Sequence, residues 1–269
     1  MSTHELEERR RHAERSSRSR YLDLVLYKTY AELRTESERT YIGFMWWIVE
    51  PVISMFVYYL VFQVIMQRGT ENFVAFLFIG LVPWRWLATS ITHGANAILA
   101  ERSLMQQVYL SKLVFPLVSV LTDTVKFLVV FLLVLMFVAL SGFGVGAPYL
   151  ALPFLLVVQF LLILGLTILC AAVTPFLPDL RIVLSNLIRL WFFLSGIFWD
   201  VKSFSPEMQR YLRLNPMTVV IESYRDILLH GEWPALPKLA AIGGFAALVC
   251  VVATLGIRRW DFVYPKLQY

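Results

Sequence analysis

SPEMQRYLRLNPMTVVIESYRDILLHG, residues 205–231, is too polar for an ordinary membrane span and too apolar for a plain loop. Ser205 before Pro206 is typical of a helix start, because serine caps free backbone N–H groups and proline suits the first helical position. Asn215-Pro216 ends that helix and can begin another. The stretch therefore predicts two short helices in succession, which either dip into a membrane and return or lie at its surface.

The second predicted helix is amphipathic, with apolar side chains on one broad face and charged side chains on the other. The apolar face consists of Val219, Val220, Tyr224, Ile227 and Leu228, and the charged face of Glu222, Arg225 and Asp226. Such a helix is expected to bury the first face and to keep the second in contact with water or polar groups.

The rest of the chain is dominated by apolar runs. Of its 269 residues, 58% are apolar and 16% are charged, whereas soluble domains are roughly half apolar and a quarter charged. Runs of bilayer-spanning length predict an all-α polytopic membrane protein. Six spans are expected, at about 41–66, 73–99, 114–140, 149–176, 182–199 and 239–257.

The segments outside the spans divide the chain further. Residues 1–20 are basic and are expected to form a flexible cytoplasmic N-terminus, in which contact with anionic lipid is favoured over contact with nucleic acid. Residues 21–36 repeat apolar side chains at helical spacing, which predicts an amphipathic helix on the membrane face or against a partner protein. Residues 37–269 are expected to form a single transmembrane domain. Within it, residues 100–113 are either a connector or a docking element for a cytoplasmic protein.

The distribution of Lys and Arg predicts the orientation of the chain. More of them lie in the N-terminal segment and in the loops on its side of the membrane than in the loops on the other side. Because positively charged loops tend to stay in the cytoplasm, both termini are expected inside the cell. Residues 205–231 then lie at the outer end.

Several charged side chains fall inside predicted spans, where an isolated charge costs roughly 3 kcal/mol. Asp123 and Lys126 are three residues apart on one helical face and can neutralise each other. Glu50, Arg85 and Arg189 are candidates for a transport path or a subunit contact, unless they reach the nearer membrane surface. With aromatic and outer-helix residues they form a candidate path and gate set: Trp46, Glu50, Trp84, Arg85, Asp123, Lys126, Arg189, Trp199, Asn215, Pro216, Tyr224 and Arg225.

The sequence lacks the motifs of an enzyme that works alone. It carries no GxxxxGK[ST] loop for ATP, no cluster with metal-ligand spacing and no recognisable nucleophile motif. If the protein pumps a substrate, the energy must come from a partner. Its 20 Phe, 12 Tyr and 8 Trp serve either as membrane-interface side chains or as stacking surfaces for sugars.

Four stretches carry a resemblance to a known family. They are TYIGFMWWIVEPV at 40–52, FIGLVPWRW at 78–86, ILAERSLMQQVYLSKLVFPL at 98–117 and SPEMQRYLRLNPMTVVIESYRDILL at 205–229. In this order and topology they resemble the membrane subunits of ABC-2-type polysaccharide exporters, the permeases for O-antigen, capsule and teichoic acid chains. The similarity covers nearly the whole chain from residue 21. Residues 178–181, PDLR, depart from the Arg-Asp pair of many relatives, so no role is carried over to that loop.

The resemblance implies a bacterial inner-membrane permease with the ABC-2, or type V exporter, fold. It implies a homodimer bound to two copies of a separate ABC ATPase, which holds ATP and Mg²⁺ while this chain binds no cofactor. The expected substrate is an undecaprenyl-linked polysaccharide that crosses through a channel at the dimer interface, and periplasmic adaptor proteins are further expected partners.

The same resemblance implies roles for three segments. Residues 21–36 are expected to be the interface helix, residues 100–113 the coupling helix and residues 205–231 two re-entrant gate helices. The side chains expected to contact the ATPase are Glu101, Arg102, Leu104, Met105, Gln106 and Val108. The alternatives are an ABC-2 exporter of drugs or lipids, a membrane-embedded enzyme that processes glycans or lipids, and a passive channel.

Overall fold

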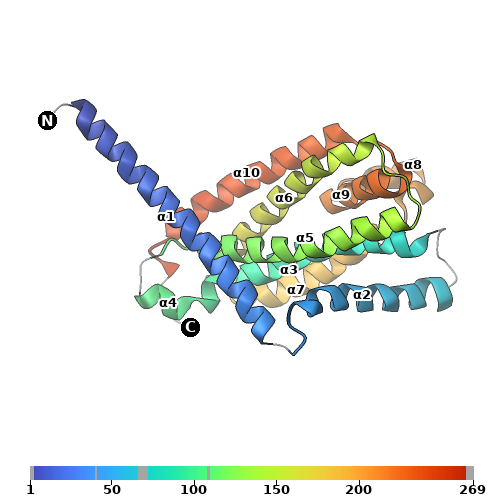
Figure 1. The fold of residues 1–269 in the computed structure, drawn as a ribbon, viewed down its shortest axis with the longest axis horizontal. Helices are drawn as coiled ribbons and strands as arrows, with labels where there is room; N and C mark the ends of the chain where they lie inside the picture. The colour runs from blue at the N-terminus through green and yellow to red at the C-terminus, as the bar shows by residue number, and fades with distance from the viewer. Residues whose placement is uncertain (1–2, 40, 66–71, 108–109, 265–269) are drawn as a thin grey trace.

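The computed structural model describes residues 3–39, 41–65, 72–107 and 110–264, with side chains from residue 21 onward except at 62 and 63. All regular secondary structure in these ranges is helical, as the sequence predicts (Figure 1). With η denoting short 3₁₀ or π segments, the elements are α1 (Thr3–Glu38), η1 (Gly43–Met45), α2 (Trp46–Tyr59), η2 (Leu60–Ile65), α3 (Phe73–Ala100), α4 (Arg102–Gln107), α5 (Val114–Leu140), η3 (Ala147–Ala151), α6 (Leu152–Val173), α7 (Leu180–Phe193), η4 (Val201–Ser203), α8 (Pro206–Leu212), α9 (Pro216–Arg225), η5 (Asp226–His230) and α10 (Leu236–Trp260).

Four helical stretches are long and apolar enough to cross a membrane: Phe73–Gln107, Val114–Leu140, Ala147–Val173 and Leu236–Trp260. The shortest has 25 residues, or about 38 Å at 1.5 Å per residue, against a hydrocarbon core of roughly 30 Å. A fifth candidate joins Tyr21–Glu38 to Gly43–Tyr59, which meet at an angle of 91°.

Two of the six predicted spans are less regular. The first contains α2, of 14 residues, followed by the six-residue π segment η2. The fifth, expected at about 182–199, is helical only from Leu180 to Phe193, about 21 Å. It ends before Gly196, whose φ of +71° is a left-handed conformation that suits glycine. Length and apolarity therefore support four or five spans, and the count of six remains a prediction.

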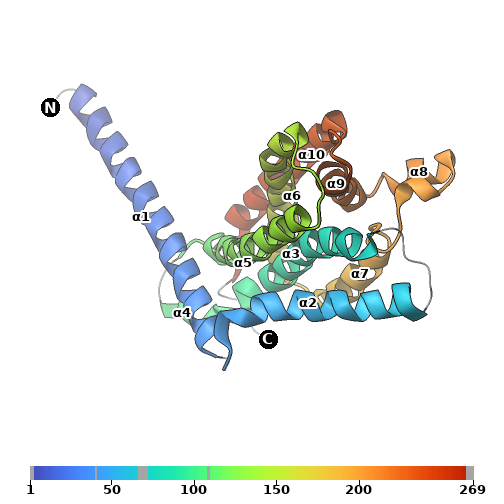
Figure 2. The same ribbon diagram turned by 45° about the vertical axis from the view of Figure 1, so that its right-hand side comes forward.

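The central helix of the bundle is α3, most of whose side chains are buried. It packs against α5, α6, α2, α9 and α7, and α2 and α7 both lie along it in Figure 2. The tightest outer pair is α6 with α10. A Cβ atom at Gly165 would lie 3.1 Å from the Ala246 carbonyl oxygen, so glycine allows these two backbones their close approach.

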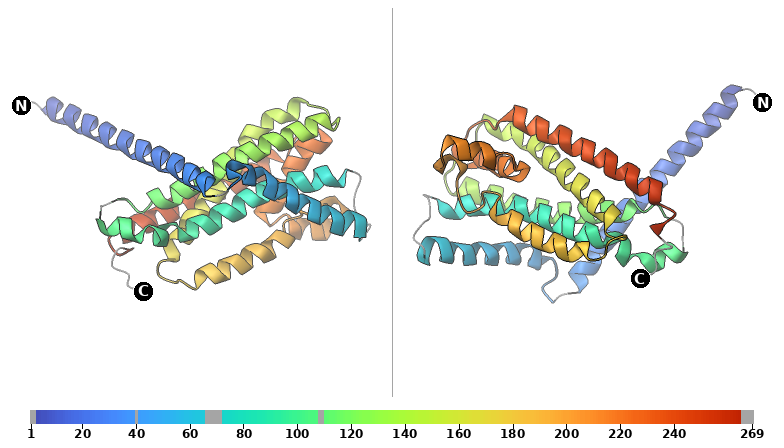
Figure 3. Two further views of the ribbon diagram at one scale, coloured as in Figure 1. Left: turned by 60° about the horizontal axis from the view of Figure 1, so that its bottom comes forward. Right: turned by 180° about the vertical axis from the view of Figure 1, so that it is seen from behind.

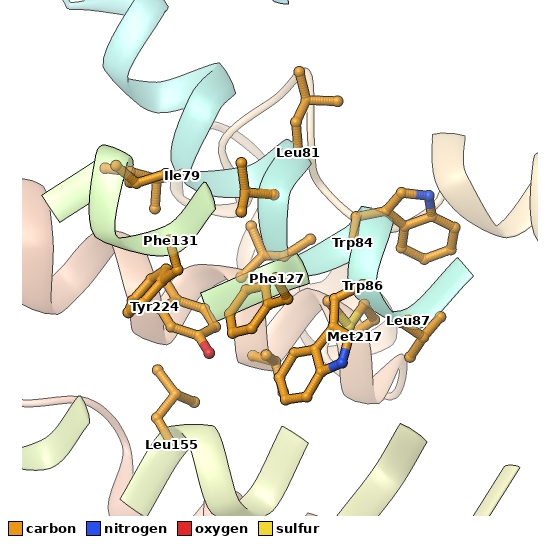
Figure 4. Close-up of a cluster of buried hydrophobic side chains, with 14 of the residues drawn as sticks. Ile79, Leu81, Trp84, Trp86, Leu87, Phe127, Phe131, Leu155, Met217 and Tyr224 are labelled. Atoms are coloured by element: carbon orange, nitrogen blue, oxygen red, sulfur yellow. The ribbon is translucent and has the colours of Figure 1, made fainter. Parts of the chain in front are cut away.

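An aromatic row forms the middle of the main core (Figure 4). Trp86 of α3 stacks on Phe127 of α5 with ring centroids 4.1 Å apart, and Phe127 stacks on Phe131 at 5.2 Å. Phe131 then meets Tyr224 of α9 edge-on at 5.6 Å. These rings connect three elements that are distant in sequence, and they position α9 within the bundle.

The functional segments lie at opposite ends of the bundle. The helix α4 and the C-terminus lie at one end, here called the α4 end, and α8 lies at the other, the α8 end (Figures 1 and 3). The helix α1 crosses the bundle near the α4 end and projects beyond it. It begins at Thr3, so one helix includes residues 3–20 of the segment expected to be flexible and the predicted amphipathic helix at 21–36.

Candidate functional site

The stretch 205–231 forms two short helices, α8 and α9, as its sequence predicts. The Ser205 side chain accepts a hydrogen bond from the Met208 N–H, and the Asn215 side chain accepts one from the Met217 N–H, so each helix has a side-chain N-cap. Gly231 ends η5 with a φ of +64°, the left-handed conformation of a helix end. The local signals in the sequence were sufficient here.

The helix α9 lies inside the bundle, packed against α3, α6 and α10. Its predicted apolar face is buried, with every member 4% exposed or less: Val219, Val220, Tyr224, Ile227 and Leu228. Glu222 and Asp226 remain partly exposed. Arg225 differs from the expectation for the charged face, because it too is only 4% exposed.

The Arg225 guanidinium binds backbone carbonyls from two distant elements. Its Nη1 donates to the Gly196 oxygen at 2.6 Å and its Nη2 to the Ile197 oxygen at 2.9 Å. Nη2 and Nε also donate to the Phe76 oxygen at 3.1 and 3.3 Å. The guanidinium carbon lies 3.3 Å from the centre of the Phe76 ring, a cation–π contact. Within the described ranges no carboxylate forms an ion pair with it, so the charge is balanced by carbonyl dipoles and an aromatic face.

Tyr224, the neighbour of Arg225, joins α9 to two spans. Its hydroxyl donates to Gln159 Oε1 of α6 at 2.8 Å, and Gln159 Nε2 donates to the Pro83 carbonyl of α3 at 2.8 Å. Tyr224 and Gln159 are fully buried. Because polar groups inside a membrane protein need partners, this chain of bonds fixes the height of α9 relative to α3 and α6.

Asn215 joins the start of α9 to the end of α7. Its Oδ1 accepts from Trp191 Nε1 at 2.8 Å, and its Nδ2 donates to the Leu194 carbonyl at 3.0 Å. Next to it is an open hollow of about 380 Å³. The hollow is lined by Trp191, Leu194, Tyr211, Leu212, Asn215 and Pro216. Trp199 lies in the same region, where its Nε1 donates to the Phe193 carbonyl at 3.2 Å.

A second polar region connects α1, α2, α3 and α5. The predicted contact between Asp123 and Lys126 is present at 3.4 Å. Asp123 also pairs with His93 Nδ1 at 2.9 Å, and Lys126 pairs with Glu36 of α1. Farther along α3, Arg85 pairs with Glu50 of α2. Arg85 and Lys126 are therefore neutralised by carboxylates on other helices.

These charges surround two adjoining hollows of about 540 and 240 Å³, which share Glu36, His93 and Lys126 in their linings. The larger lies between α1 and the α3–α5 pair, and Glu32 lines it. Burial there raises the pKa of Glu32 above its usual value, although the charge of Lys28 opposes the shift. Acids and bases are nearly balanced in both linings, so the region has no strong preference for an anion or a cation.

Within residues 100–113, where the coupling helix is predicted, the structure has a short helix, α4 (Arg102–Gln107), at the α4 end; its coupling role stays a prediction. Met105 is its one buried side chain, at 7% exposed, and it packs into a small core of residues from α3, α5, α6, α10 and the C-terminal segment. Ser103, Gln106 and Gln107 are exposed, Glu101, Arg102 and Leu104 are half-buried, and Val108 lies outside the described residues. Met105 therefore holds α4 on the bundle and points away from any cytoplasmic partner.

Other contacts brace the α4 end. Lys28 of α1 pairs with Glu101 at 2.6 Å. The backbone N–H of Lys112, beyond α4, donates to Asp261 Oδ1 at 3.0 Å, and the Tyr264 hydroxyl donates to the Ala172 carbonyl at 3.1 Å. The C-terminal segment thus links the α4–α5 connection to the end of α6.

Comparison with known proteins places the chain in a family. Residues 28–229 match the model of a family described as ABC-2 type transporter. The chain belongs to the ABC-2 type transporter family. It is 31% identical over 238 residues to the O-antigen export system permease protein RfbA of Myxococcus xanthus, covering 87% of this chain and 91% of that protein. It is 24% identical to RfbA of Klebsiella pneumoniae (92% and 93% covered) and 24% identical to the polysialic acid transport protein KpsM of Escherichia coli (74% and 79% covered).

Membership in the ABC-2 family makes this chain the permease part of a transporter, and it implies a separate ABC ATPase as partner. Among the described residues, no group of three or more His, Cys, Asp and Glu side chains could hold a metal ion.

The structure divides the candidate path and gate residues of this ABC-2 permease into three groups. Trp84, Tyr224 and Arg225 are buried and reach no surface. Glu50, Arg85, Asp123 and Lys126 line the smaller polar hollow. Trp46 and Arg189 are exposed on α2 and α7, and Trp199, Asn215 and Pro216 gather at the α8 end.

Three residues of these networks escaped sequence reasoning: Glu36, His93 and Gln159. Glu36 and His93 carry no local signal for these contacts, because their partners lie on another helix. A signal existed for Gln159, which is a polar residue in the middle of a charge-free apolar run. Such a residue inside a span is expected to have a partner.

Proposed function

We propose that this chain is the membrane subunit of an ATP-driven exporter that moves a lipid-linked polysaccharide out of the cytoplasm. The relatives support the substrate class, because their names refer to export of O-antigen and transport of polysialic acid. Two further relatives in Neisseria meningitidis are named as capsule polysaccharide export inner-membrane proteins. In this proposal the ABC ATPase binds ATP and Mg²⁺, this chain binds no cofactor, and periplasmic adaptors are possible additional partners in the cell.

The observation that carries the proposal is the exposed face formed by α2 and α7. These helices flank α3 on the same side, and Tyr58 of α2 touches Phe192 of α7 with ring centroids 5.8 Å apart (Figure 2). Arg189 is exposed on α7 and makes no hydrogen bond or ion pair with any described residue. It is preceded on the helix by the exposed polar residues Ser185 and Asn186.

The proposed depth of Arg189 argues against lipid as its surroundings. It lies nine residues after the start of α7, or about 14 Å along the helix, so in a six-span topology it would lie near the middle of a hydrocarbon core of roughly 30 Å. A charge there costs roughly 3 kcal/mol or more if it faces lipid. A second copy of this chain facing α2 and α7 would enclose a polar passage, in which Arg189 meets water and the hydroxyl groups of sugars. A homodimer with its transport path at the subunit contact follows from this reasoning.

The proposed topology has six spans. The segment α2–η2 would be the first, and α7, extended by its following turn, would be the fifth. The bias of Lys and Arg supports cytoplasmic termini, which places the α4 end inside and the α8 end outside. The helices α8 and α9 would then be the re-entrant gate at the outer mouth of the path. The exposed apolar residues Leu22, Leu26 and Tyr30 of α1 suit contact with the inner membrane surface.

Force would enter through α4. The exposed side of this helix would lie in a cleft of the ATPase, and Met105 would carry its displacement to the small core shared by α3, α6 and α10. Because a packed core has low compressibility and transmits strain, movement of α4 would shift these spans together.

The experiment that tests this proposal uses the chain expressed with its ABC ATPase in inverted membrane vesicles that contain labelled lipid-linked polysaccharide. We expect a complex with two copies of each protein and ATP-dependent disappearance of the glycan from the cytoplasmic face. Arg189→Leu is expected to lower transport several-fold while ATPase activity persists, and Arg189→Lys is expected to retain most transport. Transport that continues with a hydrolysis-deficient ATPase would contradict the proposal.

A further inference from the structure

Arg225 is a buried charge whose described partners are backbone carbonyls and an aromatic ring. The other interior charges, such as Arg85 and Lys126, pair with carboxylates. The nearest acids to Arg225 act on it only at a distance. Its contacts join α9 to the first turn of α3 and to the turn after α7.

We propose that Arg225 is the positioning residue that holds α9 in the bundle. It does so through the planar shape of its guanidinium as well as through its charge. The guanidinium presents its donors in one plane and its face to an aromatic ring at the same time. The carbonyls of Phe76, Gly196 and Ile197 accept hydrogen bonds from the edge of the guanidinium, and the Phe76 ring packs against its face. A lysine ammonium group has the same charge, but it cannot form this planar set of hydrogen bonds and stack on the ring at the same time.

The surrounding backbone is shaped to admit this side chain. A Cβ atom at Gly80 of α3 would lie 2.7 Å from Arg225 Nη2, closer than any unstrained contact. Gly196 has a φ of +71°, which turns the chain after α7 and brings its carbonyl to the guanidinium. Glycine at these two positions, one for space and one for conformation, is therefore part of the same site.

The consequence is that α9 and the end of α7 are held to one another by side-chain-to-backbone bonds. Substitution of side chains in the 194–199 turn, other than at Gly196, leaves those carbonyls in place, whereas a change at residue 225 removes the donor that they share. Loss of Arg225 would remove the side-chain donor from the buried Gly196 and Ile197 carbonyls, which lie outside any helix, and this is costly in a membrane protein interior. The role in gating rests on the proposed export function, but the positioning role can be tested without export.

The test measures the exposure of α9 directly. Cys170 and Cys250 are first replaced by alanine, and Val220, fully buried in α9, is changed to cysteine. The complete permease with its ATPase is then treated with a membrane-impermeant maleimide. We expect slow labelling with Arg225 present, at least ten-fold faster labelling in Arg225→Ala, and intermediate labelling in Arg225→Lys.

Chemical rescue separates positioning from a general loss of folding. Millimolar guanidinium should restore slow labelling in Arg225→Ala, because the ion can occupy the space between the three carbonyls and the Phe76 ring, and urea, its neutral isostere, should not. Gly80→Ala should speed labelling when Arg225 is present and add little in the Arg225→Ala background. If Val220→Cys stays protected in Arg225→Ala, or if Arg225→Lys labels as slowly as Arg225, or if urea rescues as well as guanidinium, the proposal is wrong. None of these results depends on glycan export, so failure of the proposed function would be seen separately.

Discussion

The two helices proposed to act at opposite ends of this permease are attached to it in opposite ways. The helix α4 has six residues and buries a single side chain, Met105, whereas α9 has ten residues and buries eight. The first packs on a small core through Met105 and the half-buried Leu104, and the second is enclosed by α3, α6 and α10 and is joined to α3 and α6 by hydrogen bonds. Because of this difference in burial, α4 can move relative to the bundle with little repacking, whereas α9 can move only if the packing around it changes.

The attachment of α4 can be weakened at Met105, its one buried side chain. Met105→Ala removes the buried side chain and is expected to lower the free energy of unfolding by about 2 kcal/mol, the low end for such a truncation because the site lies at the edge of the bundle. The ATPase should still bind and hydrolyse ATP, but transport should fall more than ten-fold. Thermal unfolding, ATPase activity and transport measured on one preparation check this.

The matched control for that experiment is Met105→Leu, which conserves volume and is expected to keep most transport. If Met105→Ala transports as well as the unchanged chain, Met105 does not carry the displacement of α4.

The embedding of α9 can be weakened at Gln159. Gln159→Leu leaves the Tyr224 hydroxyl and the Pro83 carbonyl without a partner, which is expected to cost about 1–2 kcal/mol of stability, since hydrogen bonds between membrane helices are individually modest. Combining it with Tyr224→Phe removes one of the stranded groups. The double variant should therefore be more stable than the sum of the two single effects, as measured by unfolding in detergent. Strict additivity would show that the two side chains do not act as a pair.

The connection between α8 and α9 can be altered at Asn215 and Pro216. Replacing both with alanine removes the N-cap and the proline at the first helical position, at a cost of about 1 kcal/mol. The two helices should merge, the Trp191 contact should be lost, and transport should fall while the complex still assembles. Ser205→Ala, which removes the longer 3.5 Å cap bond of exposed α8, is the control and should have a smaller effect. Wild-type transport by the double alanine variant would show that this turn is not part of the gate.

The smallest effect on stability is expected from the charges beside α4. Reversing both Glu101 and Arg102 should change the free energy of unfolding by less than about 1 kcal/mol, because partly exposed ion pairs contribute little. It should nevertheless uncouple ATP hydrolysis from transport. Adding Lys28→Glu restores the pair with residue 101, so recovery of transport would assign the defect to the α1 contact, and no recovery would assign it to the ATPase contact. Full transport by the original double variant would contradict the coupling role of α4.

Much of this structure could be predicted because its signals are local. The apolar run at Val114–Leu140 matches its helix, and the caps at Ser205 and Asn215 mark the starts of α8 and α9. The depth of α9 in the bundle could not be predicted, because it depends on Arg225 finding carbonyls 28 and 149 positions away in the chain. The same holds for His93 and Asp123, whose contact joins α3 to α5. The spacing of a polar side chain predicts which face of a helix it occupies, but its partner is known only from the folded structure.

In the proposed mechanism, ATP hydrolysis moves α4, Met105 transmits this movement to the bundle, and the glycan leaves at the α8 end. The most direct test compares transport per ATP hydrolysed in vesicles containing the unchanged permease, Met105→Leu or Met105→Ala, each with the same ABC ATPase. The account predicts similar ratios for the first two and a ratio at least ten-fold lower for Met105→Ala, with hydrolysis and subunit binding maintained. An unchanged ratio for Met105→Ala, or a fall caused only by loss of ATPase binding, would contradict it.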